Sequence, residues 1–386
     1  MAFSPPLTAV PADALRCPTG CEWHCAGGEW KAWLLHAVKN GVRDCAEAFS
    51  LARTASRSAM LRHSSDWRTA LWAFVFFPAL GFAPYVEPRF VPWLLPLSLY
   101  FGFCAGVFSH NQNHCPMFTG RTMNSLYSAW LSIFYGYPTF FWIPTHNLNH
   151  HKYVNKAGDA TITWRYSKKN TWLVASTYYF VSAYWQKPLI DEYSRKAHDT
   201  NPRLVRQMRL QYVTLIGSHA ALLAVALWLR GPRIGPLVYG FGFLIPAMFA
   251  NWSMIFINYI QHVHTDPWSE HNHSRNFCSP LGNWLVFNNG YHAAHHESPG
   301  LHWSKLPDAH ARIAGSIHQD LKQPSIFRFC LRAYLLGALS EGFRTKQIGR
   351  APYDPPVGRV NVETASVAAV EAGVNASMVS PGESPA

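Results

Sequence analysis

The chain has 386 residues, of which 49% are hydrophobic, 15% are aromatic and only 14% are charged, and its formal net charge is +12. This composition argues against a wholly soluble protein and is typical of a polytopic membrane protein with sizeable water-facing parts. The basic excess is compatible with binding to nucleic acid, with binding to a membrane surface or with a topology signal. The positions of the charged residues along the chain distinguish these three interpretations.

Four stretches approach the ~20 apolar residues needed to cross the ~30 Å hydrocarbon core of a bilayer. They are Leu71–Val86, Val91–Phe108, Tyr212–Leu229 and Pro236–Ile260. Only a few residues separate the members of each pair, so the pattern predicts two helical hairpins. The long connections and both termini then lie on one side. The predicted fold is all-α, a polytopic membrane protein with four transmembrane helices and a cytoplasmic helical cap.

The charge distribution indicates on which side of the membrane the long connections and the termini lie. Between Asn111 and Gln211 there are twelve Lys or Arg residues against four acids. Because positively charged connections stay in the cytoplasm, we predict that both termini and the histidine-rich connections are cytoplasmic. Topology and anionic lipid headgroups account for the basic charge, and we expect no nucleic-acid partner.

The remaining segments are predicted to be interfacial or irregular. The aromatic run Tyr127–Pro144 predicts a re-entrant or interfacial segment, and Thr171–Trp185 predicts an interfacial helix. Residues 1–67 are interpreted as an amphipathic cytoplasmic segment, because they lack the pattern of a cleaved signal. We therefore expect a membrane domain over residues 68–345 and a disordered tail over residues 346–386.

Eight cysteines do not predict a disulfide framework, because several fall in or beside predicted cytoplasmic or membrane segments. Cys17, Cys21, His24 and Cys25 lie close together, but their spacing lacks the CxxC pairing that is usual for zinc. We interpret these cysteines as free thiols, with zinc binding as the alternative.

The histidines are the most specific feature of the sequence. Many of the twenty lie in five short motifs, HNQNH, HNLNHH, NYIQHVH, HNHSRNF and HAAHH. Residues four apart share a face of a helix and residues three apart nearly do, so we expect the histidines of HNQNH, and those of HAAHH, to aim at one point. In HNLNHH, His150 is expected to follow His146 on its face, whereas His151 is turned away by ~100° and would serve a second metal.

These motifs fall at one predicted membrane boundary, so a single site could collect them. Nine imidazoles are enough for two metals with four or five ligands each. Neutral nitrogen ligands suit iron, copper, nickel and zinc, and the scarcity of carboxylates argues against magnesium, calcium and manganese. The nine candidate ligands are His110, His114, His146, His150, His151, His262, His292, His295 and His296.

The spacings HxxxH, HxxxHH and HxxHH, in this order and each at a membrane boundary, resemble the histidine boxes of the integral-membrane fatty acid desaturase and hydroxylase superfamily. NYIQH, with Asn258 four residues before His262, resembles a further ligand motif of that family. NHSRNF and NNGYHAAHH resemble a bacterial branch of the desaturases. The likeness covers residues 68–325.

The resemblance implies a non-haem di-iron centre in the cytoplasmic cap, which reduces O2 and abstracts hydrogen from an unactivated C–H bond. It also implies that the nine histidines are the iron ligands and that Asn258 holds a metal-bound water. His264 has no family counterpart and is left out. Four residues are expected to support the loop after the fourth span, namely His271, His273, Arg275 and Asn276.

The predicted reaction is desaturation of a fatty acyl chain, carried by a lipid or as a thioester of CoA or a carrier protein. A hydroxylase, an acetylenase or a carotenoid oxygenase is the alternative, because the ligands do not determine the outcome. No motif of a fused electron donor is present, so electrons are expected from a separate ferredoxin, rubredoxin or cytochrome. The aromatic residues expected to line the acyl slot, or else to be interfacial anchors, are Tyr135, Phe141, Trp142, Trp252 and Trp284.

Metal transporters and b-type cytochromes are also rich in histidine. A transporter is expected to carry ionisable ligands within its spans, but the four predicted spans contain no Asp or Glu and a single histidine, His219. A cytochrome would place its axial histidines inside facing helices rather than at the water boundary. The sequence therefore favours the enzyme over both.

Overall fold

The computed structural model describes residues 60–356 of the chain. The predicted N-terminal segment before residue 60, which contains the cluster of Cys17, Cys21 and Cys25, lies outside the described residues, and so does the predicted tail beyond residue 356. The described part is mostly helical, in agreement with the predicted fold class.

Helices make up most of the first half of the described part. They are η2 (Ser64–Asp66), α3 (Trp67–Leu71), η3 (Trp72–Phe76), α4 (Phe77–Val86), η4 (Pro88–Phe90), α5 (Val91–His114), α6 (Arg121–Tyr135), η5 (Thr139–Phe141), η6 (Ile143–His150), α7 (His151–Tyr153) and α8 (Trp172–Thr200). Two of them, η3 and η6, are π-helices with a wider turn than the α-helix.

The second half adds a long helix pair and a set of short elements. They are α9 (Pro202–Tyr239), η7 (Gly240–Leu244), α10 (Ile245–His262), β1 (Asn276–Phe277), α11 (Pro280–Leu285), α12 (His292–Glu297), η8 (Trp303–Lys305), α13 (Leu306–Ile313), η9 (Gln319–Leu321), β2 (Lys322–Gln323), α14 (Ile326–Cys330), η10 (Leu331–Leu336), α15 (Gly337–Leu339) and η11 (Glu341–Phe343). The strands β1 and β2 pair in parallel, with Asn276 opposite Lys322.

Three helical runs in the described part are long and apolar enough to cross a membrane, where the sequence predicted four helices. They are Ser64–Val86, Pro88–His114 and Pro202–His262. The first two contain the predicted spans Leu71–Val86 and Val91–Phe108, and the third contains both of the others.

The third run is bent at Gly231. A straight helix of its 61 residues would be about 90 Å long, three times the ~30 Å of a hydrocarbon core. Gly231 has φ 71° and ψ 176°, a conformation that glycine adopts readily because it lacks a Cβ. The two arms fold back on each other, so that Nδ1 of His219 lies 2.9 Å from the Tyr239 hydroxyl. The run is therefore a helical hairpin.

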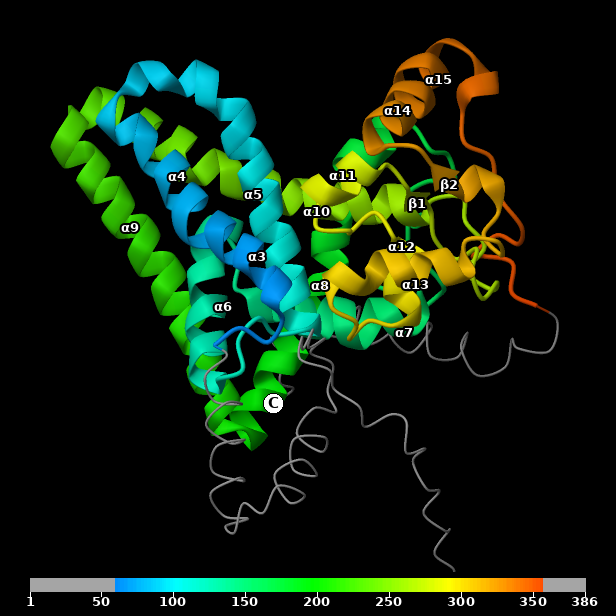
Figure 1. Ribbon diagram of the computed structural model, residues 1–386, viewed down its shortest axis with the longest axis horizontal. Coiled ribbons are helices and arrows are strands. Elements are labelled where there is room, and N and C mark those ends of the chain that lie inside the picture. Colours follow the sequence, from blue (N-terminus) through cyan, green and yellow to red (C-terminus); the bar gives the residue numbers. More distant parts are fainter. Residues whose placement is uncertain (1–59, 357–386) are drawn as a thin grey trace, which may run out of the picture. The chain divides into compact units, whose positions relative to one another are not determined.

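The two helical hairpins meet at their tips. Nε of Arg230, beside the bend, donates to the carbonyl of Tyr85 at 2.9 Å, and the Tyr85 hydroxyl donates to the carbonyl of Leu222 at 3.0 Å. In Figure 1, α12 and α13 lie well away from this end of the helices. The tips and the histidine motif of α12 are thus at different ends of the bundle.

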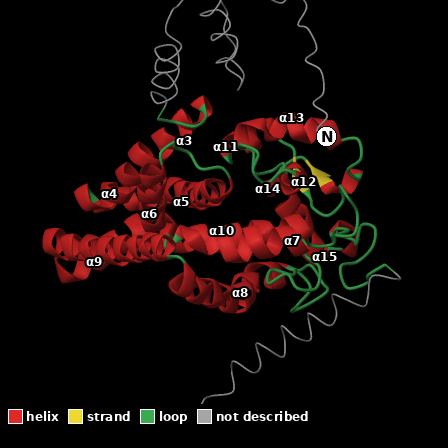
Figure 2. Ribbon diagram, turned by 90° about the horizontal axis from the view of Figure 1, so that it is seen from below, coloured by secondary structure: helices red, strands yellow, loops and turns green. Residues whose placement is uncertain are grey.

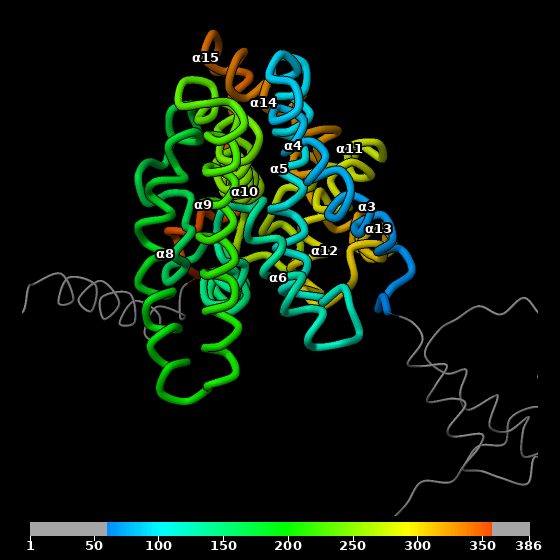
Figure 3. Tube along the Cα trace, turned by 90° about the vertical axis from the view of Figure 1, so that its left-hand side faces the viewer, coloured from blue at the N-terminus to red at the C-terminus, as the bar shows by residue number. Residues whose placement is uncertain are grey.

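Helix α5 packs along α10 and also contacts α4 and α6, and α8 lies on the opposite side of α10 (Figure 2). Helices α8 and α9 are in contact; they lie next to each other in the view of Figure 3, and Figure 1 shows them diverging from the turn that joins them. Small residues allow the closest approaches. A Cβ on Gly102 would lie 2.5 Å from the Pro246 carbonyl oxygen, and one on Gly242 would lie 2.4 Å from the Gly81 carbonyl oxygen.

The short C-terminal elements pack around the end of α10. Phe329 of α14 shares a buried cluster with Tyr178 of α8 and Tyr259 of α10. The first residues of the predicted tail join this part, since the backbone N–H of Ile348 donates to the His264 carbonyl at 3.1 Å. These contacts support the loop that follows α10.

Replacing Gly102 by alanine is expected to lower the thermal stability of the full-length protein in detergent, because overpacking of a close helix contact costs about 1–3 kcal/mol. Gly217→Ala is the matched control, since nothing lies within 4 Å of a Cβ at that position and alanine is the better helix former. Equal melting temperatures for the two variants would contradict the close packing of α5 on α10.

Candidate metal centre

The nine candidate histidines come together as two neighbouring groups. Within each group the ring nitrogens that could bind a metal all lie within 4.8 Å of one another. The first group has five members and the second has four. The first group consists of His110, His114, His146, His151 and His295. The second group consists of His150, His262, His292 and His296.

In the first group the Nε2 atoms converge. His110 Nε2 lies 2.9 Å from His146 Nε2 and 3.1 Å from His295 Nε2. His151 Nε2 lies 3.1 Å from the same two atoms. The Nε2 of His114 is buried without a hydrogen-bond partner, although its ring packs 4.8 Å from that of His295, centroid to centroid.

The second group converges in the same way. His262 Nε2 lies 3.1 Å from His150 Nε2 and 2.9 Å from His292 Nε2, and His296 Nε2 lies 3.1 Å from His292 Nε2. The rings of His151 and His296 have centroids 4.4 Å apart and join the two groups.

Burial and crowding disfavour the charged form of several of these imidazoles. Burial, and after it the neighbouring imidazoles, lower the pKa of His292, His295 and His296 well below the ordinary value for histidine. The same causes lower the pKa of His151 to about 2. Neutral rings offer nitrogen lone pairs, and a metal ligand must be in that form.

The arrangement fits two bound metals. Two imidazole nitrogens that are each ~2.1 Å from one metal and at right angles to one another lie about 3 Å apart, which matches the observed spacing of Nε2 atoms. The partnerless Nε2 of His114 is explained if a metal is its partner. A donor set of neutral nitrogens suits iron, copper, nickel or zinc.

The HNLNHH motif divides between the groups in a way that the sequence did not predict. His150 shares a face with His146 as expected, since their rings stack with centroids 5.1 Å apart, and His150 and His151 diverge to different groups as expected. The grouping differs from the expectation, because His146 joins His151 in the first group and His150 belongs to the second. Residues Ile143–His150 form a π-helix, whose wider turn keeps residues five apart, as well as four apart, near one another.

The HAAHH motif is divided as well. His292 and His296, four apart on α12, belong to the second group, whereas His295 belongs to the first. The expectation of a single target for these three rings was therefore wrong. His295 and His296 are ~100° apart on the helix, so α12 serves one group on each side.

A carboxylate that the sequence analysis counted only as charge lies directly behind the second group. Asp159 is fully buried, and His150 Nδ1–H donates to its Oδ2 at 2.8 Å. Burial acts to raise the pKa of Asp159, but His150 and hydrogen bonds from Thr161 and Asn155 outweigh it and lower the pKa. The charged carboxylate orients the ring of His150 so that Nε2 faces inward.

The loop after HNLNHH is fixed tightly around this carboxylate. Val154 and Asn155 have φ of 45° and 62°, a left-handed conformation that is strained for a β-branched residue such as valine. Asn155 Nδ2 donates to the His262 carbonyl at 2.9 Å. The loop thus holds two ligand candidates from distant motifs, His150 through Asp159 and His262 through Asn155. The signal in the sequence is an acid directly after a glycine in the connection that follows the motif.

The supporting residues after α10 contact both the helix end and α12. His262 Nδ1–H donates to the His273 carbonyl at 3.0 Å. The guanidinium of Arg275 donates to the Ile260 carbonyl, and Asn276 Oδ1 accepts from the Ala293 N–H at 2.9 Å. His264 lies outside both groups, with its Nδ1 2.9 Å from the Thr345 hydroxyl.

Asn258 lies on α10, one turn before His262. Its side-chain amide nitrogen is buried and has no hydrogen-bond partner within the protein. The residue therefore keeps a free donor close to the end of α10, and its predicted role in holding a water stays a prediction.

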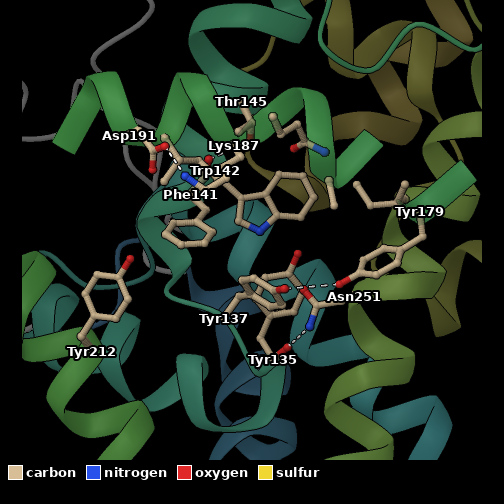
Figure 4. A pocket seen from close by; sticks show the side chains of 14 residues that line it. Tyr135, Tyr137, Phe141, Trp142, Thr145, Tyr179, Lys187, Asp191, Tyr212 and Asn251 are labelled. Carbon is tan, nitrogen blue, oxygen red and sulfur yellow. Dashed lines mark hydrogen bonds and ion pairs between the residues drawn. The ribbon is translucent and has the colours of Figure 1, made fainter. Parts of the chain in front are cut away.

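A cavity of about 400 Å³ lies beside the first group. It is bounded by η5, η6, the end of α6, the first part of α9 and the middle of α8 and α10, and six of its fourteen lining residues are aromatic (Figure 4). The charged residues that line it are Lys187 and Asp191, which form an ion pair with each other. Among its lining residues are Tyr135, Tyr137, Phe141, Trp142, Tyr179 and Tyr212.

Three of the five predicted wall residues line this cavity, namely Tyr135, Phe141 and Trp142. The other two do not. Trp252 stacks on Phe256, and Trp284 packs against the guanidinium of Arg68.

Comparisons with known proteins agree with the site. A sequence model described as "Fatty acid desaturase" matches residues 88–323. The human sphingolipid delta(4)-desaturase/C4-monooxygenase is 25% identical to this chain over 249 residues, which cover 60% of this chain and 69% of the human protein. No solved structure matches the chain.

Replacing Asp159 by asparagine is expected to weaken metal binding about 10- to 100-fold, the usual effect of removing a carboxylate that orients a histidine ligand. The metal content of the purified full-length protein, measured by mass spectrometry against a competing chelator, checks this. Asp308→Asn is the control, because Asp308 is exposed on α13. Wild-type metal retention in both variants would contradict the role of Asp159.

Proposed function

Since the chain belongs to the fatty acid desaturase family, which matches residues 88–323, we propose that it introduces a double bond into a fatty acyl chain with O2 as co-substrate. The observation that carries the proposal is the convergence of nine histidines, six of them buried and three partly buried, into two groups. The substrate would be an acyl lipid or an acyl thioester of CoA or a carrier protein.

The two histidine groups would each hold one iron ion. The preference for iron rests on the family, and the neutral nitrogen donors are compatible with it. The bound metals would supply the oxidising power that no amino-acid side chain has, because breaking an aliphatic C–H bond is beyond acid–base catalysis. The protein's own part is to keep the imidazoles neutral and oriented. Asn258 would hold a metal-bound water near the end of α10.

The net reaction balances with two external electrons. A –CH2–CH2– unit, O2, two electrons and two protons give –CH=CH– and two water molecules. The four cysteines of the described part, Cys104, Cys115, Cys278 and Cys330, are free thiols. We therefore assign the electrons to a separate carrier protein of the ferredoxin, rubredoxin or cytochrome type.

The aromatic cavity next to the first group would receive the acyl chain. Aromatic walls favour an apolar chain, and the ion pair of Lys187 with Asp191 leaves the cavity without net charge. Tyrosine hydroxyls of Tyr137 and Tyr179, which lie 3.4 Å apart, offer neutral hydrogen-bonding partners at its wall.

We further propose that both helical hairpins cross the membrane, which gives four spans with the termini and the histidine groups in the cytoplasm. The bend at Gly231 and the contact of Arg230 with Tyr85 support a common end for the two hairpins. The twelve basic residues between positions 111 and 211 support a cytoplasmic position for the other end.

Hydroxylation is the second candidate. The human relative bears a name that combines a desaturase with a C4-monooxygenase. The same donor set could serve either outcome, because the fate of the substrate depends on how its carbons lie against the oxidised centre.

Expression of the full-length chain in a lipid-producing host is expected to yield new double bonds in total lipids, detected by mass spectrometry. The double bonds should disappear in His150→Ala, because the second group then loses a member, and should persist in His198→Ala, which removes an exposed histidine on α8. Hydroxylated products would favour the second candidate. Purified protein that carries zinc alone would contradict the di-iron assignment.

A further inference from the structure

The indole of Trp142 lies between the aromatic cavity and the first histidine group. The ring of Trp142 lines the cavity, and its centroid lies 5.2 Å from the ring of His110 and 5.1 Å from that of His146. We propose that Trp142 determines which carbon of the acyl chain reaches the metal centre, an inference that rests on the proposed function.

Trp142 differs from the other aromatic residues that line the cavity in its contact with the histidines. Of the described side chains around the cavity, it is the one whose aromatic ring packs against members of the histidine groups. Phe141, its neighbour in the chain, lines the same cavity but packs against Tyr137 and Tyr212. The indole is therefore the wall nearest the histidines, whereas the phenyl ring of Phe141 faces Tyr212; Figure 4 shows both rings at the cavity.

The position of the indole is fixed by packing. Trp142 lies between η5 and the π-helix η6, the element that carries His146 and His150. Its ring stacks on Tyr135 with an interplanar angle of 25°. No hydrogen bond ties its Nε1–H, which is buried without a partner. Trp142 thus directly precedes the element that carries these histidines, so the size of its side chain would set the distance between an acyl chain in the cavity and the first group.

This arrangement makes the position of the double bond depend on the volume at residue 142. A pocket that gains or loses room for one methylene changes discrimination between substrates by about 10- to 200-fold. A free-energy difference of the same size is expected between two positions of one acyl chain that differ by one methylene along the cavity. A smaller side chain would let the chain advance toward the histidines and would present a different carbon.

The test compares Trp142→Leu and Trp142→Ala with two controls in the expression host. Phe141→Leu enlarges the same cavity away from the histidines, so the yield changes but the double-bond position should stay. Trp252→Phe alters a tryptophan on α10 that does not line the cavity. Mass spectrometry of derivatised lipids gives the position of each double bond, and the iron content shows that the centre is intact.

The expected result is a shift of the main product by at least one carbon, with about a tenfold change in the ratio of positional isomers, in the Trp142 variants only. Unchanged positions in the Trp142 variants, or the same shift in Phe141→Leu, would overturn the inference. Neither result would affect the assignment of the chain as a desaturase, which fails if the wild type forms no oxidised product.

A second measurement does not depend on activity. In metal-free full-length protein, an acyl lipid that carries bromine on its chain should quench tryptophan fluorescence. The quenched fraction should fall in Trp142→Phe and stay at the wild-type value in Trp252→Phe. Equal quenching in wild type and Trp142→Phe would show that the chain does not reach Trp142 and would overturn the inference even if the enzyme is active.

Discussion

Imidazoles packed this closely cannot all carry a positive charge in one buried volume. Two unit charges 4 Å apart repel by about 4 kcal/mol at an effective dielectric constant of 20, and within each group the ligand nitrogens lie within 4.8 Å of one another. Burial adds a further cost for every proton bound. The surrounding structure meets this constraint by excluding water, so that His150, His262 and His292 are at most 3% exposed. The proposed metals would then bring the positive charge that the rings cannot carry.

The backbone conformation decides how the histidines are shared between the two groups. The rings of His146 and His150 stack, yet the Nε2 atom of His146 on the π-helix η6 meets that of His151, and His150 belongs to the other group. A π-helix is rarely stable by itself. Here the turn after it is held by Asn155, which hydrogen-bonds to the carbonyl of His262, so that the irregular helix and the end of α10 support each other. Division of one motif between two groups also keeps the groups close together, because its members are neighbours in the chain.

The sequence was sufficient to identify which residues gather, because histidine spacing and apolar stretches are visible in it. It predicted the helix end at Val86, where α4 does end, but it ended the next span at Phe108, whereas α5 continues to His114. Hydropathy detects only the apolar part of a helix, and the polar turn HNQNH is helical because it packs against its neighbours. The bend at Gly231 lies in the short link that the sequence predicted between the third and fourth apolar stretches, whereas the π-helix was not predictable because it changes neither composition nor period. Asp159 was overlooked because its role depends on a contact nine residues away.

The position of Asp159 explains how a site without carboxylate ligands can still use a carboxylate. Bound directly to a metal, a carboxylate would neutralise part of its charge and favour a harder ion. Placed behind His150, on Nδ1, it leaves Nε2 free and makes the ring a stronger donor. The three further hydrogen bonds to Asp159, from Asn155 and Thr161, occupy its oxygens and prevent it from turning toward the centre. A single buried charge can therefore orient a ligand while every atom that faces the metal position remains a neutral nitrogen.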